Sequence, residues 1–119
     1  MSERDIQTAI LREFGSDRRL RLWRSNAGVG VVGDVALIMK ICRRFGVPAR
    51  LVRFGVPGQA DLTGILPTGR RLEVECKTEN GRQTADQANY EAMIGRMGGL
   101  YVLARSPEDV RAAIGEELE

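Results

Sequence analysis

The segment Arg71–Lys77 carries the side chains best suited to chemistry in this sequence. It alternates apolar and charged residues (RLEVECK), a pattern typical of a β-strand with one face toward the core. Glu73, Glu75 and Lys77 are then expected to share the other face. Taken alone, the pattern fits an ordinary half-exposed strand whose charged side chains are hydrated.

Asp61 favours a more specific interpretation. It begins an expected strand at 61–66, and Pro67-Thr68-Gly69 is expected to fold that strand back against the next one as a hairpin. Counting from the turn puts Asp61 beside Glu75 or Cys76. Two carboxylates would then meet next to Lys77, an arrangement that is costly unless a cation lies between them.

The types of donor indicate which cation this would be. Carboxylate oxygens without histidine or thiolate partners favour Mg²⁺ or Mn²⁺ over zinc. The chain has no histidine, which excludes a histidine general base. An ion bound by Asp61 and Glu75 would polarise a phosphodiester and lower the pKa of a bound water. Lys77 would orient that water or neutralise the developing charge, and the backbone carbonyl of Cys76 is a candidate further ligand.

Capping signals and periodicity predict the elements that position this hairpin. Ser2 with Asp5 forms a capping box for a helix at 3–14, and Thr84 with Gln87 forms another for a helix that ends near residue 98. The other expected elements are strands at 19–25, 50–54, 71–77 and 100–104, a short helix within 31–45, and a last helix that starts at Ser106. This order predicts an α/β fold with a central mixed sheet flanked by helices.

Length and composition predict one domain, residues 1–119. No apolar run approaches the roughly 20 residues that span a bilayer, and the first residues do not resemble a secretory signal. A cytoplasmic location, in a bacterium or for a phage protein in its host, is therefore expected, with no membrane partner. Cys42 and Cys76 are far apart in the sequence, so both are expected to be reduced and buried.

Basic residues are nearly all arginine, and the only lysines are Lys40 and Lys77. The net charge of +2 is too small to indicate a nucleic-acid partner by itself. Arginine suits phosphate because its guanidinium is a planar fork of donors. A genome that favours arginine codons would explain the same composition, and the two explanations stay open.

Five pieces of the sequence, in order, resemble one known family. They are Trp23-Arg24-Ser25-Asn26-Ala27-Gly28, Arg53-Phe54-Gly55-Val56-Pro57-Gly58-Gln59-Ala60-Asp61-Leu62, Leu72-Glu73-Val74-Glu75-Cys76-Lys77-Thr78, Gln83-Thr84-Ala85-Asp86-Gln87 and Gly99-Leu100-Tyr101-Val102-Leu103-Ala104. The family is the VRR-NUC branch of the PD-(D/E)XK nuclease superfamily, which occurs as stand-alone phage and bacterial domains and within larger repair nucleases.

The resemblance implies a restriction-endonuclease-like αβββαβ core and Mg²⁺- or Mn²⁺-dependent hydrolysis of DNA. It also implies a homodimer that acts on branched or structured DNA in replication, repair or recombination. Carried over by position, Asp61 and Glu75 would be metal ligands and Lys77 the catalytic lysine. Gln87 matches a glutamine associated with the site, and Glu3 matches an acidic residue that approaches the metal in related enzymes.

Two parts of the sequence depart from the family pattern. Ala60 stands where the superfamily name has proline, and residues 29–49 match no motif of the family. The role of that segment in substrate choice is open.

Two other functions compete with the nuclease hypothesis. Gly28, Gly30 and Gly33 form a literal G-x-G-x-x-G, which in a dinucleotide-binding protein cradles a pyrophosphate. The arginine-rich strand before it, the lack of an acidic residue for a ribose and the short chain count against this, so a flexible loop and no dinucleotide cofactor are expected. A non-catalytic DNA-binding module of the same fold is the second alternative.

Residues around the expected hairpin receive weaker assignments. Arg24, Asn26, Arg53 and Gln59 are candidates to contact phosphate or to position the catalytic turn. Glu73 is interpreted as a solvated neighbour of the site. Trp23, in the middle of an expected strand, is interpreted as a core residue rather than a platform for base stacking.

Overall fold

The computed structural model describes residues 1–25, 28–29, 34–49 and 53–119. The chain divides into two compact units. The larger contains Met1–Ser25 and Pro57–Glu119, and the smaller lies within Asn26–Val56. Each unit is described by itself.

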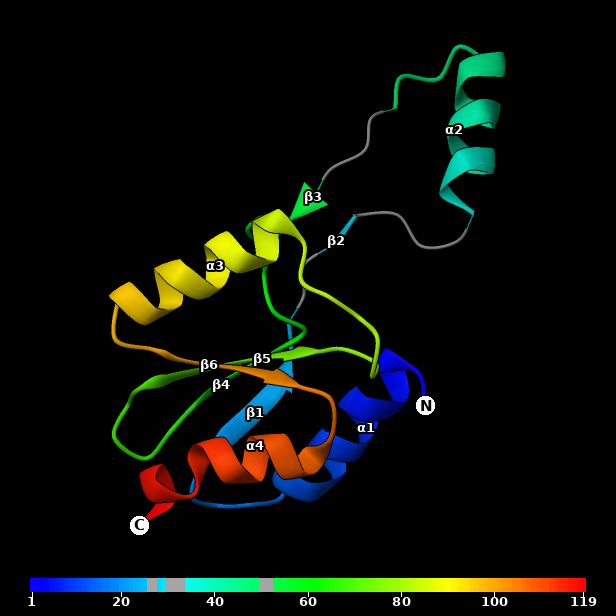
Figure 1. The fold of residues 1–119 in the computed structure, drawn as a ribbon. Coiled ribbons are helices and arrows are strands. Elements are labelled where there is room, and N and C mark those ends of the chain that lie inside the picture. The colour runs from blue at the N-terminus through cyan, green and yellow to red at the C-terminus, as the bar shows by residue number, and fades with distance from the viewer. Residues whose placement is uncertain (26–27, 30–33, 50–52) are drawn as a thin grey trace. The chain divides into compact units, whose positions relative to one another are not determined.

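A four-stranded mixed sheet forms the centre of the larger unit (Figure 1). Its strands are β1 (Arg21–Arg24), β4 (Leu62–Ile65), β5 (Arg71–Cys76) and β6 (Leu100–Ala104), in the order β1-β4-β5-β6. The β1–β4 and β4–β5 pairs are antiparallel, and β5–β6 is parallel. The central mixed sheet expected from the sequence is confirmed.

Helices cover both faces of this sheet (Figure 1). On one face lie α1 (Glu3–Phe14) and α4 (Pro107–Ile114), the latter followed by a short 3₁₀ helix, η1 (Glu116–Leu118). On the other lies α3 (Ala85–Arg96). The order α1-β1-β4-β5-α3-β6 is the expected αβββαβ core. Both capping boxes are present, Ser2 with Asp5 at α1 and Thr84 with Gln87 at α3.

The main core lies between the sheet and the layer of α1 and α4. The alternation in β5 directs Leu72, Val74 and Cys76 into this core, where each is fully buried. The apolar stripes of α1 and α4 complete it, notably with Ile10 and Ile114.

The second face of β5 is buried as well, which corrects the expectation of a half-exposed strand. Glu73 is 0 % exposed, Glu75 2 % and Lys77 7 %. The cause is α3, which covers this face with a smaller apolar cluster that contains Tyr90 and Ile94. Glu73 is therefore not the solvated neighbour that the alternation suggested.

Trp23 also differs from expectation, because it is 42 % exposed and is not a core residue. Pairing of Trp23 with Thr63, and of Thr63 with Glu73, puts it on the face that α3 covers over β5 and β6. The sheet has two edge strands, β1 and β6, and α3 packs on the side of β6, so the part of this face at β1 is left open.

The smaller unit contains one helix and one strand pair. Helix α2 (Val35–Arg44) begins at Asp34, whose side chain accepts a hydrogen bond from the Leu37 N–H at 3.0 Å. Strands β2 (Gly28–Val29) and β3 (Arg53–Phe54) pair with each other in an antiparallel ladder. The strand expected at 50–54 thus lies outside the main sheet. Its residues 50–52, and residues 31–33 of the expected helix, lie outside the described residues.

Gly28 lies in this antiparallel ladder. A dinucleotide fingerprint instead needs its first glycine in the turn from a parallel strand into a helix. Gly30 and Gly33 lie outside the described residues. Within the described part of the chain, no helix has both the length and the apolar character required to cross a bilayer.

Candidate active site

Asp61 lies next to the central strand β5, as the hairpin register predicts. Leu62 pairs with Val74, so one step back along β4 puts Asp61 opposite Glu75. The Cys76 N–H donates a hydrogen bond to Oδ2 of Asp61 at 2.8 Å. The Asp61 carbonyl accepts a hydrogen bond from the Ser25 N–H at 2.9 Å, which joins this residue to the end of β1.

Only one of the two oxygens of the Glu75 carboxylate has interaction partners. Oε1 accepts a hydrogen bond from Nε2 of Gln87 at 3.0 Å and lies 3.7 Å from Nζ of Lys77. Oε2 is buried and has no hydrogen-bond partner among the described residues. A buried carboxylate oxygen normally has a partner, so this atom is available to bind a ligand. Oε2 of Glu73 is likewise buried and without a hydrogen-bond partner among the described residues, but it has no second carboxylate paired beside it as Glu75 has in Asp61.

The raised pKa of Glu75 also favours a cation at this site. Burial and the neighbouring Asp61 carboxylate raise the pKa of Glu75 to about 8, and the Lys77 ammonium offsets only part of this. Burial, followed by the charges of Asp61 and Glu75, raises the pKa of the Cys76 thiol to about 12. The Cys76 thiol is thus protonated near neutral pH. When Glu75 is deprotonated, the two carboxylates outnumber the Lys77 ammonium, and a cation would relieve this surplus of negative charge.

Gln87 owes its orientation to the cap of helix α3. Its Oε1 accepts a hydrogen bond from the Thr84 N–H at 2.9 Å, while the Thr84 hydroxyl accepts one from the Gln87 N–H at 3.2 Å. Because the amide oxygen is used by the cap, the amide nitrogen must face Glu75.

Lys77 follows β5 directly, and its backbone continues the parallel ladder, because its N–H donates a hydrogen bond to the Ala104 carbonyl at 3.0 Å.

The loop after Lys77 is held by Arg105, a residue that the sequence analysis did not select. The Arg105 guanidinium donates hydrogen bonds to the carbonyls of Thr78, Glu79 and Gly81. Arginine at the end of a strand is common, so no sequence signal distinguished it.

This arrangement lies in a fold that is already known. A solved structure described as a "VRR_NUC domain protein" superposes on this chain with a TM-score of 0.60 and 20% sequence identity, over 98% of this chain and 88% of that one. This chain has the VRR_NUC fold. The resemblance drawn from the five sequence pieces is thereby confirmed for the fold. No family model matches the sequence, and no curated protein matches it.

The remaining site residues predicted from the sequence lie around this cluster of Asp61, Glu75 and Lys77 or outside the described residues. Glu3, exposed in the first turn of α1, is near enough to raise the pKa of Glu75. Arg24 donates hydrogen bonds to Gln7 at 3.4 Å and Thr8 at 3.3 Å, both on α1. Gln59 donates from Nε2 to the Ser25 hydroxyl at 2.5 Å, which fits a role in positioning the turn before Asp61. Asn26 and the side chain of Arg53 lie outside what is described.

Gly58 joins that turn to helix α3. Its φ of +77° lies in the left-handed region, and a Cβ there would meet the Asp86 carbonyl oxygen at 2.1 Å and the Gln87 nitrogen at 2.6 Å. The turn before Asp61 therefore packs directly on the helix start that carries Gln87. Ala60, the residue in place of the superfamily proline, is buried in the same cluster as Tyr90.

A second carboxylate network lies beside the first on the same face of β5. Oε1 of Glu73 accepts hydrogen bonds from the Thr63 hydroxyl at 3.1 Å and the Tyr90 hydroxyl at 2.9 Å, and it pairs with the Arg71 guanidinium. Tyr90 and Gln87 are one helical turn apart, so α3 contacts both buried carboxylates of β5. Sequence alternation predicted the shared face but not these partners.

The donor set fits a hard divalent cation. Asp61 and Glu75 offer carboxylate oxygens close together, and Oε2 of Glu75 is the bare atom that an ion would use. Within residues 1–25, 28–29, 34–49 and 53–119, no three Asp, Glu, Cys or His side chains gather as a metal site. Two protein carboxylates plus water suit Mg²⁺, which retains several waters when bound.

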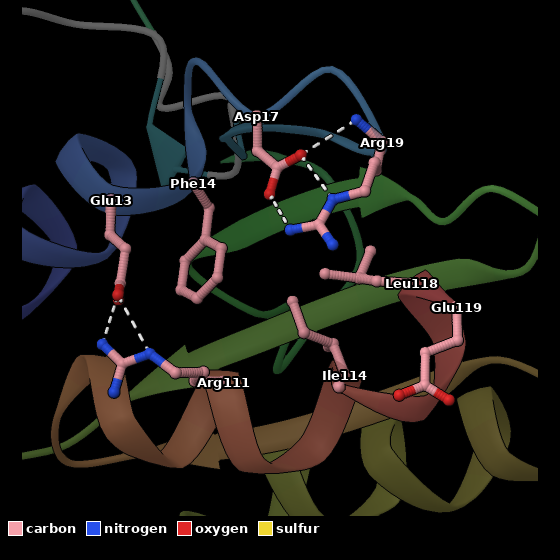
Figure 2. A pocket seen from close by; sticks show the side chains of 9 residues that line it. Glu13, Phe14, Asp17, Arg19, Arg111, Ile114, Leu118 and Glu119 are labelled. Atoms are coloured by element: carbon pink, nitrogen blue, oxygen red, sulfur yellow. Dashed lines mark hydrogen bonds and ion pairs between the residues drawn. The ribbon is translucent and has the colours of Figure 1, made fainter.

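A hollow of about 320 Å³ elsewhere in the fold is a different feature (Figure 2). It lies between the end of α1, helix α4 and η1. Phe14, Ile114 and Leu118 are its apolar lining residues. Four of its charged residues form two ion pairs, Glu13 with Arg111 and Asp17 with Arg19, and Glu119 lines it as well. It contains none of the residues discussed above for chemistry.

Proposed function

We propose that this protein is a nuclease that requires Mg²⁺ or Mn²⁺ and hydrolyses phosphodiester bonds of DNA. The observation that supports this best is the meeting of Asp61, Glu75 and Lys77 at one end of the β4–β5 hairpin. The VRR_NUC fold of the chain supports the same activity.

Asp61 and Glu75 would hold the ion, with Oε2 of Glu75 as one donor and the Cys76 carbonyl and Glu3 as further candidates. When bound, the ion would supply a Lewis acid for the phosphodiester and a bound water of lowered pKa. The ion would also neutralise the surplus negative charge that raises the pKa of Glu75.

The remaining roles belong to the side chains of this chain. The Lys77 ammonium, buried and close to Glu75, is suited to orient the attacking water and to stabilise the negative charge of the transition state. Gln87 would keep the Glu75 carboxylate in one rotamer, which preserves the geometry that the reaction needs. Lys77 would thus stabilise charge in the transition state, and Gln87 would fix the position of the Glu75 carboxylate.

A cleavage assay tests the proposal. DNA is incubated with Mg²⁺, Mn²⁺ or EDTA, and the parent is compared with Lys77→Ala and Glu75→Ala. Lys40→Ala is the matched control, because Lys40 is the only other lysine and lies exposed on α2. We expect metal-dependent cleavage by the parent and by Lys40→Ala and at least a roughly hundredfold loss in the other two variants. Equal cleavage by all four proteins would exclude the mechanism, and DNA binding without cleavage would favour the non-catalytic module.

Substrate and assembly are further parts of the proposal. Branched or structured DNA in replication, repair or recombination is the expected substrate, and a panel of flaps, junctions, nicked duplexes and single strands would rank the candidates. A homodimer is expected because cutting both strands of a duplex calls for two sites. Light scattering that gives only the monomer mass would contradict it. A cytoplasmic location stays a prediction from the sequence.

A further inference from the structure

The open half of the sheet beside Asp61 and Glu75 carries an exposed aromatic residue and two exposed arginines. Arg21, Ile65 and Arg71 lie side by side across β1, β4 and β5, and Trp23, Thr63 and Glu73 form the next row. Directly paired residues on adjacent strands share a face, and so do residues two apart along a strand. Both rows therefore lie on the face that carries Glu75.

Four of these side chains are exposed although the sheet around them is buried. Trp23 is 42 % exposed and Ile65 50 %, and the Arg71 side chain is 56 % exposed. Arg21 is exposed as well, and no ion pair involves it within the part of the chain that the structure describes. An exposed tryptophan with one arginine next to it and another on the same face suits a ligand that is both planar and anionic.

Such a ligand is an unpaired nucleotide. Its base stacks on an indole, and its phosphate attracts guanidinium groups, whereas a base inside a duplex is not free to stack on a side chain. The strand spacings put Trp23 about 12 Å from Glu75, two residues along the strand and two strands across. That span is a few nucleotides of one DNA strand.

We propose that Trp23, with Arg21 next to it on β1 and Arg71 on the same face of the sheet, binds an unpaired base of a nucleic-acid strand whose neighbouring phosphodiester lies at Asp61 and Glu75. This rests on the proposed nuclease function and narrows its substrate to nucleic acid with a single-stranded segment. Trp23 then sets which part of the strand reaches the reacting groups.

Trp23 is the only tryptophan in the chain, so its fluorescence reports on this surface alone. A thymidine oligonucleotide of about 12 nucleotides, a length within the usual range for single-strand sites, is titrated into the parent protein in EDTA, so that the DNA stays intact. We expect the oligonucleotide to quench the fluorescence, and a blunt duplex of equal length to have little effect. Quenching should weaken as salt is raised, because phosphate contacts release counterions.

Variants separate stacking from charge. By anisotropy of a labelled oligonucleotide, Trp23→Ala should weaken binding about tenfold, and Trp23→Phe should retain most of it, because phenylalanine also stacks. Arg21→Gln should weaken binding and lower its salt dependence. Arg12→Gln removes the same charge from the exposed side of α1, in the layer on the other face of the sheet, and should change neither. Circular dichroism melts show whether each variant is folded.

Four outcomes would overturn the inference. The first is oligonucleotide binding that leaves the fluorescence unchanged, and the second is equal affinity of the parent and a folded Trp23→Ala. The third is stronger quenching by the duplex. The fourth is a fluorescence change that follows protein concentration alone, with a doubled mass, since it would mean that a second copy covers this face. Metal-dependent cleavage that persists in any of these cases leaves the nuclease function standing, whereas its absence from the parent refutes that function separately.

Discussion

The side-chain amide of Gln87 holds the Glu75 carboxylate with a donor whose direction is fixed by a helix cap. Nε2 of Gln87 lies 3.0 Å from Oε1 of Glu75, and its Oε1 accepts a hydrogen bond from the Thr84 N–H. One residue thus caps the start of helix α3 and orients a proposed metal ligand. A capping box, usually a device for helix stability, here also determines the position of a functional group.

Substitutions at the cap should separate its two roles. Gln87→Glu retains a capping-box residue but replaces the donor that faces Glu75 with an acceptor, so cleavage should fall at least about tenfold. Thr84→Ala removes the cap hydroxyl, so it should cost about 1 kcal/mol of stability and leave most of the activity. Cleavage rates and thermal melts of both variants test this pair. Full activity in Gln87→Glu would contradict the role of its amide.

The pKa of Glu75 predicts how the stability of the metal-free protein changes with pH. The folded pKa of about 8 lies above the ordinary 4.5, so between these values the folded state binds more protons than the unfolded state. The free energy of unfolding should therefore decrease from about pH 4.5 to about pH 8. Glu75→Gln carries no titrating group there and should lack this decrease, which urea unfolding at several pH values in EDTA would measure.

Metal affinity gives the complementary test of Glu75. The ion binds the deprotonated carboxylate, so the affinity for Mn²⁺ should increase as the pH rises toward 8. Calorimetric titration of the parent should show this increase together with proton release. If Mn²⁺ bound Glu75→Gln as tightly as the parent at pH 8, Glu75 would not be a ligand.

The buried carboxylate of Glu73 predicts a difference between two tyrosines. Tyr90→Phe removes a hydroxyl that donates to the fully buried Glu73, so it should cost about 1–3 kcal/mol of unfolding free energy. Tyr101→Phe is the matched control, because its hydroxyl accepts a hydrogen bond from the partly exposed Gln83 and should cost less. Chemical unfolding of the two variants makes the comparison, and equal costs would show that the Glu73 network does not contribute stability.

Two glycines in the left-handed backbone region allow a further comparison between matched variants. Gly58→Ala and Gly69→Ala both place a Cβ at positive φ, near +77° and +87°. A Cβ at position 69 meets nothing within 4 Å, whereas one at position 58 collides with the backbone of Asp86 and Gln87. Gly69→Ala should cost about 1–2 kcal/mol. Gly58→Ala should cost more and also lower cleavage, because the start of α3 must shift. Similar losses of stability and activity in both would contradict this.

Local signals in the sequence predicted most of the fold. Both capping boxes, the hairpin turn and the alternation in β5 are short-range patterns. The turn and the alternation were enough to put Asp61 beside Glu75 or Cys76, and the structure puts it opposite Glu75. The alternation could not show that α3 covers the second face, because a row of charged residues looks the same whether it is hydrated or paired. Glu73 was therefore assigned to solvent, although Thr63, Arg71 and Tyr90 surround it.

Errors at the edges of the sheet have a similar origin. Trp23 resembles a core residue in a strand of mixed pattern, but only the strand order shows that β1 is an edge and that α3 does not reach it. The strand near residue 54 pairs with Gly28–Val29 and not with the main sheet, a partner choice that the sequence of one strand does not encode. Arg105 donates hydrogen bonds to three backbone carbonyls. Every residue has a backbone carbonyl, so the sequence does not show which ones Arg105 binds.

Strand β5 lies between β4 and β6, with backbone hydrogen bonds along both of its edges. Its amide protons can exchange with solvent only when the sheet itself separates, and such openings need nearly the full free energy of unfolding. Glu75, which this strand carries, is therefore among the last parts of the molecule to become disordered. Heating should consequently end catalysis and melt the protein over the same temperature interval, without an earlier stage in which a folded molecule has lost its reactive centre.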